Sequence, residues 1–203
     1  MINYTVDTLE LGAFTTESGE KIENLKLRYE HVGYQGQPLV VVCHALTGNH
    51  LTYGTNEQPG WWREIIDGGY MPIHDYQFLT FNVIGSPFGS SSHLTDQHFP
   101  KKLTLRDVTK AIELGIQALG FNKINILIGG SLGGMQVMEL LYNRRFVVDK
   151  AVILAATDKT SSYSRAFNEI ARQAIHIGGK EGLSIARQLG FLTYRSSKSY
   201  DER

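Results

Sequence analysis

The chain has 203 residues, of which 42% are hydrophobic, and its 20 basic and 20 acidic side chains give a formal net charge of zero. This length fits one globular domain with a sizeable core, and the balanced charge gives no general electrostatic reason to expect a nucleic acid or an anionic membrane as partner. The single cysteine, Cys43, excludes an internal disulfide and fits a reducing compartment. The sequence has neither a signal-peptide pattern nor an apolar stretch of transmembrane length, so a cytoplasmic protein is expected.

The first half of the chain predicts mainly strands. Residues 8–33 predict an antiparallel pair of alternating segments, separated by a turn at residues 17–20. Residues 39–43 read Leu-Val-Val-Val-Cys, which is the continuous apolar run of a strand buried on both faces of a sheet. The other elements expected before residue 85 are a loop, a short helix and a strand, at residues 44–48, 61–67 and 76–84.

The second half predicts helices that alternate with strands. Thr104 and Asp107 have the spacing of a capping box, and they begin an amphipathic helix that ends at Gly120. A strand, a turn and a helix follow over residues 123–142, and residues 150–156 predict a further buried strand. This alternation favours the α/β class, with a mostly parallel sheet flanked by helices on both faces. After it, two helices are expected within residues 161–192, with a break at residues 178–179.

The turn between the strand and the helix carries the sequence Gly129-Gly-Ser-Leu-Gly133. It fits the G-x-S-x-G nucleophile elbow, in which a serine stands on a tight, strained turn and the residues two before and two after it must be small. The following helix N-terminus then stabilises negative charge that develops beside the hydroxyl. A glycine-rich loop that binds phosphate, or nothing, is the alternative. The flanking strand and helix favour Ser131 as a nucleophile.

A nucleophilic serine needs oxyanion donors, a base and a carboxylate that orients the base. The backbone N–H of Leu132 is one candidate donor, and the loop at residues 44–48, with Ala45 and Leu46, is the source of the other. Only His176 follows Ser131, and it lies within a predicted helix, where a packed or surface histidine is more common than a base. The carboxylates that follow the elbow include three candidates by residue type alone, Asp149, Asp158 and Asp201.

Several motifs together resemble one family, the homoserine O-acetyltransferases, which are acyltransferases of methionine biosynthesis with the α/β-hydrolase fold. The loop His44-Ala-Leu-Thr-Gly48 together with Gly129-Gly-Ser-Leu-Gly-Gly-Met-Gln136 is far more specific than the elbow alone. The resemblance extends along nearly the whole chain, through Leu27-Arg-Tyr-Glu30, Gly60-Trp-Trp62, Asn82-Val-Ile-Gly85, Gly89-Ser90, Phe99-Pro100, Leu103-Thr-Leu-Arg-Asp107 and Thr193-Tyr-Arg195.

This resemblance implies a ping-pong reaction in which Ser131 takes an acetyl group from acetyl-CoA and passes it to the side-chain hydroxyl of L-homoserine. Leu46 and Leu132 would supply the oxyanion N–H groups, and Arg195 would hold the carboxylate of the amino acid. Acetyl-CoA is a co-substrate, and neither a bound cofactor nor a metal is implied. Residues 1–160 would form the N-terminal part of the α/β-hydrolase core, and residues 161–203 a helical lid through which the family forms homodimers.

The family's catalytic Asp and His, and the final strands of its sheet, correspond to positions beyond residue 203. The resemblance therefore implies the N-terminal two-thirds of a family member. Three alternatives stay open at this point: a carboxylesterase, a transferase that uses succinyl-CoA or another hydroxy-amino acid, and a non-catalytic chain that has the serine without its base.

Overall fold

The computed structural model describes residues 2–202 and divides into two compact units, residues 1–157 and 158–203. The first unit contains the sheet and the elbow, and the second is helical. The role of the second unit as a lid, with a boundary near residue 160, stays a prediction.

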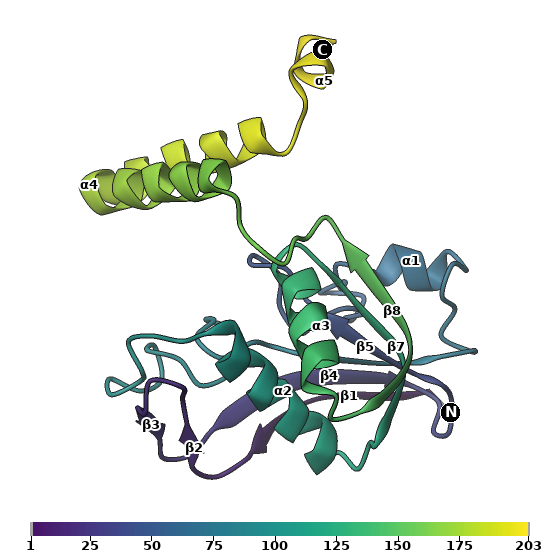
Figure 1. The fold of residues 1–203 in the computed structure, drawn as a ribbon. Coiled ribbons are helices and arrows are strands. Elements are labelled where there is room, and N and C mark those ends of the chain that lie inside the picture. The colour runs from purple at the N-terminus through teal and green to yellow at the C-terminus, as the bar shows by residue number, and fades with distance from the viewer. Residues whose placement is uncertain (1, 203) are drawn as a thin grey trace. The chain divides into compact units, whose positions relative to one another are not determined.

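The first unit is built on one six-stranded sheet with the strand order β1-β4-β6-β5-β7-β8 (Figure 1). Strands β1, β4 and β6 pair antiparallel, whereas β6, β5, β7 and β8 run parallel to one another. The bounds are β1 (Asn3–Glu10), β4 (Lys26–Gly33), β5 (Leu39–Cys43), β6 (Gln77–Phe81), β7 (Lys123–Gly130) and β8 (Val147–Leu154). A short hairpin of β2 (Phe14–Thr15) and β3 (Lys21–Ile22) surrounds the expected turn. The mostly parallel sheet that the sequence predicts is thus confirmed.

Helices cover both faces of the sheet. Helices α2 (Leu105–Ala118) and α3 (Leu132–Asn143) pack side by side on one face, and α1 (Arg63–Asp67) lies against the other (Figure 1). The predicted capping box is confirmed, because the N–H of Asp107 donates to Thr104 Oγ1 and the N–H of Thr104 donates to Asp107 Oδ2. The five residues of β5 are all buried between the two layers, as the apolar run predicted.

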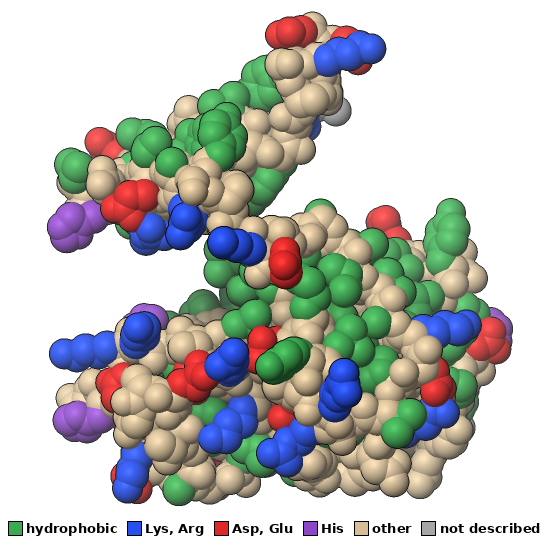
Figure 2. Space-filling model, viewed as in Figure 1, with side chains coloured by type: hydrophobic (Ala, Val, Ile, Leu, Met, Phe, Trp, Pro, Cys, Tyr) green, Lys and Arg blue, Asp and Glu red, His purple; other side chains and the backbone are tan. Residues whose placement is uncertain are grey.

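The prediction that residues 150–156 form a buried strand is wrong on burial. The strand exists as β8, but most of its side chains are exposed. The reason is its place in the sheet: within residues 2–202, β8 is the outermost strand, pairs only with β7, and is contacted by α3 on one face. Hydrophobic side chains accordingly gather at the surface over β8 and α3, including Val152, Ile153 and Leu154 (Figure 2).

The second unit consists of α4 (Ser162–Thr193) and the short α5 (Ser197–Asp201). Gly179 interrupts α4 with a φ of 54° and a ψ of −121°, which divides it into two helices at the break that the sequence predicted. Helix α5 was not expected from the sequence. Among residues 2–202, no helix combines the length and apolar character needed to cross a membrane.

Candidate active site

Ser131 occupies a strained backbone conformation where β7 meets α3. Its φ of 54° and ψ of −121° lie in a region that non-glycine residues rarely adopt, and such strain gathers at functional sites. The N–H of Ser131 donates to the carbonyl oxygen of Leu154 at 2.9 Å, which fixes the turn against β8. The side chain is exposed, so its hydroxyl stands clear of the sheet as the elbow requires.

The glycines around Ser131 are required by close backbone approach. A Cβ at Gly129 would lie 2.4 Å from the carbonyl oxygen of Gly133, across the turn itself. A Cβ at Gly133 would lie 2.0 Å from the carbonyl oxygen of Cys43, at the end of β5. The two small residues of the motif therefore allow the turn to close and allow α3 to begin against the neighbouring strand.

Leu46 and Leu132, the two candidate oxyanion donors, lie around one surface depression of about 450 Å³. Leu132 is the first residue of α3, so its N–H has no partner within the helix. Leu46 is 78% exposed in the loop after β5, and among the described residues no protein acceptor takes its N–H. The depression continues over Val83, Ser86 and Leu103, which gives an acyl group a partly apolar surface beside the elbow.

His44 anchors the loop that carries Leu46. The N–H of Val83 donates to His44 Nε2 at 3.1 Å, so Nε2 is an acceptor and Nδ1 carries the proton, which it donates to the carbonyl oxygen of Ala45 at 2.8 Å. Burial lowers the pKa of His44, which is 1% exposed, so the imidazole is neutral. With both nitrogens engaged, His44 acts as a fixed bridge between the loop after β5 and the end of β6.

Gln136 completes this anchor from the opposite side. It lies on α3, is fully buried, and donates from Nε2 to the carbonyl oxygen of His44 at 3.2 Å. The helix that begins at Ser131 is thereby tied to the loop that bears Leu46. The sequence alone predicts no role for Gln136 or for the His44 imidazole. A polar residue one turn into an otherwise apolar helix is the signal by which Gln136 could be found.

No base is in contact with Ser131 in the described part of the chain. Within residues 2–202, no histidine hydrogen-bonds to the Ser131 hydroxyl. His176 is exposed on α4, and Arg195 is exposed between α4 and α5, so both belong to the second unit. Burial raises the pKa of Cys43 to about 12, which makes its thiol inert at neutral pH.

A metal site is also not formed by the described residues. Within residues 2–202, no group of three or more His, Cys, Asp or Glu side chains is arranged to hold a metal ion. The described residues offer a strained serine at the start of α3, and Leu46 and Leu132 border one depression next to that helix start. A strained serine and free backbone N–H groups are features that acyl-transfer sites use.

Comparison with known proteins supports this class. The family described as alpha/beta hydrolase fold matches residues 38–177, which is more than half of the chain. The chain therefore belongs to the α/β-hydrolase fold family. This agrees with the strand order, with the helices on both faces of the sheet and with the elbow at Ser131.

Within this family, the chain is similar to homoserine O-acetyltransferases. It is 35% identical to the protein of that name from Geotalea uraniireducens, over 90% of this chain and 57% of the relative, and 31% identical to that from Sulfurimonas autotrophica, over 92% and 59%. The crystal structure of homoserine O-acetyltransferase from Staphylococcus aureus matches with 85% identity and a TM-score of 0.95, over 99% of this chain and 62% of that chain. The chain thus spans about three-fifths of these proteins. Esterase E22 matches with a TM-score of 0.81 at 18% identity, which shows the shared fold alone.

Proposed function

We propose that the chain is the nucleophile-bearing part of a homoserine O-acetyltransferase, which transfers an acetyl group from acetyl-CoA to the side-chain hydroxyl of L-homoserine. The observation that supports this most directly is the strained Ser131 at the start of α3, in a chain 85% identical to a protein of that name. The proposed reaction is that of the whole protein, because the relatives are longer than this chain, which spans about three-fifths of their length.

In the first half of the reaction, Ser131 Oγ attacks the thioester carbonyl of acetyl-CoA while a base takes the hydroxyl proton. The C–S bond then breaks, CoA leaves as the thiol after it receives that proton, and acetyl-Ser131 remains. The N–H groups of Leu46 and Leu132 stabilise the oxyanion of each tetrahedral intermediate. Loss of one such donor costs about a hundredfold to a thousandfold in rate.

In the second half, the hydroxyl of L-homoserine attacks the acetyl-serine carbonyl, and Ser131 is released with its proton restored. We propose that Arg195 holds the carboxylate of homoserine through its guanidinium, because a bidentate pair fixes both charge and orientation. The second unit would act as the lid and as the surface of a homodimer in the cytoplasm. These assignments rest on the family resemblance.

The geometry around Ser131 is compatible with two other acyl reactions. A carboxylesterase would use the same serine and pass the acyl group to water, and a succinyltransferase would take a larger acyl donor. The partition between transfer and hydrolysis depends on how well the site excludes water. A non-catalytic chain is the alternative from a different class, and the absence of a base in contact with Ser131 within residues 2–202 is the observation that favours it.

The deciding experiment is an intact-mass measurement on the purified natural protein, first alone, then with acetyl-CoA, and then with L-homoserine added. The transferase predicts an acetyl adduct that peptide mapping places on Ser131 and that homoserine removes. Ser131→Ala, which keeps the fold of the turn, should give no adduct.

The other outcomes separate the alternatives. An adduct that decays in buffer as fast as with homoserine indicates an esterase, and an adduct that forms only with succinyl-CoA indicates the succinyltransferase. Protein that is folded and never acylated indicates a non-catalytic chain and contradicts the proposal. Arg195→Gln should raise the KM for homoserine and leave acetylation by acetyl-CoA unchanged.

A further inference from the structure

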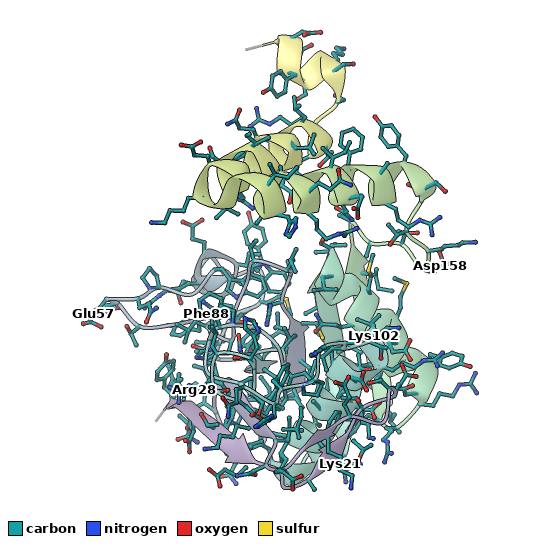
Figure 3. The ribbon with its side chains drawn as sticks, turned by 90° about the vertical axis from the view of Figure 1, so that its left-hand side faces the viewer. Lys21, Arg28, Glu57, Phe88, Lys102 and Asp158 are labelled. Atoms are coloured by element: carbon teal, nitrogen blue, oxygen red, sulfur yellow. The ribbon has the colours of Figure 1, made fainter. Side chains whose placement is uncertain are left out.

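A second cavity of the first unit has an arginine without an acidic partner. It measures about 520 Å³ and is lined by residues of β1 and β4 and by the loops that follow β5 and β6. Its polar groups include those of Arg28, His50 and Gln58, and apolar surface comes from Val6, Leu51 and Phe88. Arg28 and Phe88 are labelled in Figure 3. None of these residues lines the depression that Leu46 and Leu132 border.

The backbone and stem of Arg28 are held in place. Its N–H donates to Ser90 Oγ at 3.0 Å, and its carbonyl oxygen accepts from the N–H of Asn82 at 2.8 Å. Gly89, with a φ of 101°, lies against its methylene stem, since a Cβ there would be 3.3 Å from Arg28 Cγ. The stem is therefore packed and the position of the guanidinium is restricted.

The guanidinium of Arg28 has no carboxylate partner among the described residues. It donates from Nη1 to Thr8 Oγ1 at 3.2 Å, and none of the ion pairs within residues 2–202 involves Arg28. Glu30, two residues along the same strand and therefore on the same face, is occupied elsewhere: its oxygens accept the N–H groups of Thr52, Tyr53 and Gly54 at 2.7–2.8 Å. The remaining N–H groups of the Arg28 fork are available to a ligand.

His50 adds an unsatisfied polar group beside this arginine. It is 8% exposed, and Nδ1 is buried without a hydrogen-bond partner within residues 2–202. Burial first, and the charge of Arg28 next, lower the pKa of His50 to about 4, so the ring is neutral at pH 7. Because Nδ1 is itself covered, His50 forms a neutral part of the cavity wall beside Arg28 and leaves the binding of a ligand to the arginine.

We propose that this cavity binds the carboxylate of a small organic acid, with Arg28 as its charge partner and with its uncharged part against Val6, Leu51 and Phe88. The guanidinium fork matches a carboxylate in geometry as well as in charge. A single cation also matches a single negative charge, whereas phosphate carries more charge than one arginine balances, and the neutral His50 adds none. The inference is independent of the transferase proposal because it involves neither Ser131 nor an acyl group.

The test is calorimetric titration of the purified natural protein with acetate, butyrate, 3-phenylpropionate and inorganic phosphate at pH 7 and constant ionic strength. We expect saturable binding that tightens from acetate to 3-phenylpropionate as more apolar surface is buried. Arg28→Gln should weaken butyrate binding by about tenfold to a hundredfold, which is the typical effect of losing a hydrogen bond between charged groups. Arg106→Gln is the matched control, because that arginine is exposed and already paired with Glu17 and Glu139.

A second pair of variants tests the charge without disturbing the packed arginine. Gln58 is exposed at the cavity, so Gln58→Glu and Gln58→Lys should both fold. The first should weaken butyrate binding and the second strengthen it, each by roughly twofold to fivefold. The proposal is overturned if no carboxylate binds saturably, if Arg28→Gln and the Gln58 variants bind as wild type does, or if phosphate binds more tightly than butyrate.

Discussion

Replacement of Gly133 by alanine tests directly why the elbow needs a glycine. The added Cβ would lie 2.0 Å from the carbonyl oxygen of Cys43 and 3.1 Å from that of His44, and Cβ contacts under 3.0 Å are essentially never observed. The Cβ is fixed to the backbone of residue 133 and the atom it meets is a backbone carbonyl oxygen, so no change of rotamer relieves the contact and α3 must move away from the end of β5. Overpacking costs about 1–3 kcal/mol, and a clash that only a backbone shift can relieve belongs at the upper end, so we expect a loss of about 3 kcal/mol.

Urea unfolding measures this loss, because both tryptophans, Trp61 and Trp62, lie in the first unit and their fluorescence reports its unfolding. Gly178→Ala is the matched control: it is the same substitution in α4, where an added Cβ meets nothing within 4 Å. It should raise helix stability, seen by circular dichroism, by roughly 0.5–1 kcal/mol. An ordinary surface substitution changes the free energy of unfolding by no more than about 0.5 kcal/mol. If Gly133→Ala changes it as little as that, the close-approach explanation is refuted.

Three further outcomes follow from the same structure. Ser131→Gly should stabilise the first unit by about 1 kcal/mol in urea unfolding because it relieves the strained φ, whereas Ser131→Ala, which keeps the strain, should not. His50 has a folded pKa of about 4 against 6.5 unfolded, so its contribution to stability is complete above pH 6.5 and is lost as the pH falls toward 4, by up to about 3 kcal/mol. His50→Gln should flatten that part of the stability–pH curve, and His98→Gln, at an exposed position, should not. Glu30→Gln should cost about 2–4 kcal/mol in urea unfolding, because an amide cannot accept all three backbone N–H groups that the carboxylate now accepts, whereas the exposed Glu64→Gln should be neutral.

The features that the sequence predicted correctly depend on local chemistry. Gly129 and Gly133 could be assigned to a tight turn because only residues without a Cβ allow the backbone to come so close to itself around the serine. In the structure, backbone carbonyl groups lie within 2.4 Å of where those Cβ atoms would be. Thr104 and Asp107 predicted a capping box because the two residues satisfy each other's N–H groups three positions apart, whatever the rest of the fold does. The continuous apolar run of β5 likewise required burial on both faces.

The features that could not be predicted depend on partners distant in the sequence. The apolar composition of β8 indicates a strand but not which elements cover it, and these decide its exposure within residues 2–202. The sequence does not show that Arg28 lacks a carboxylate partner, because Glu30 on the same strand is a possible partner. In the fold, Glu30 instead accepts the backbone N–H groups of residues 52–54. Neither the exposure of β8 nor the partners of Arg28 can be predicted from local sequence patterns, because both depend on contacts between segments that are distant in the sequence.

The loop after β5 borders both the depression at the elbow and the cavity of Arg28. Leu46 borders the depression at the elbow, and His50, four residues later, borders the cavity of Arg28. The loop after β6 repeats the arrangement, with Ser86 at the first site and Phe88 at the second. His44 ties these two loops together, because the N–H of Val83 in the loop after β6 donates to the ring of His44 in the loop after β5. The neutral state of His44 is what permits this bridge, because a protonated ring would lose the acceptor that Val83 requires.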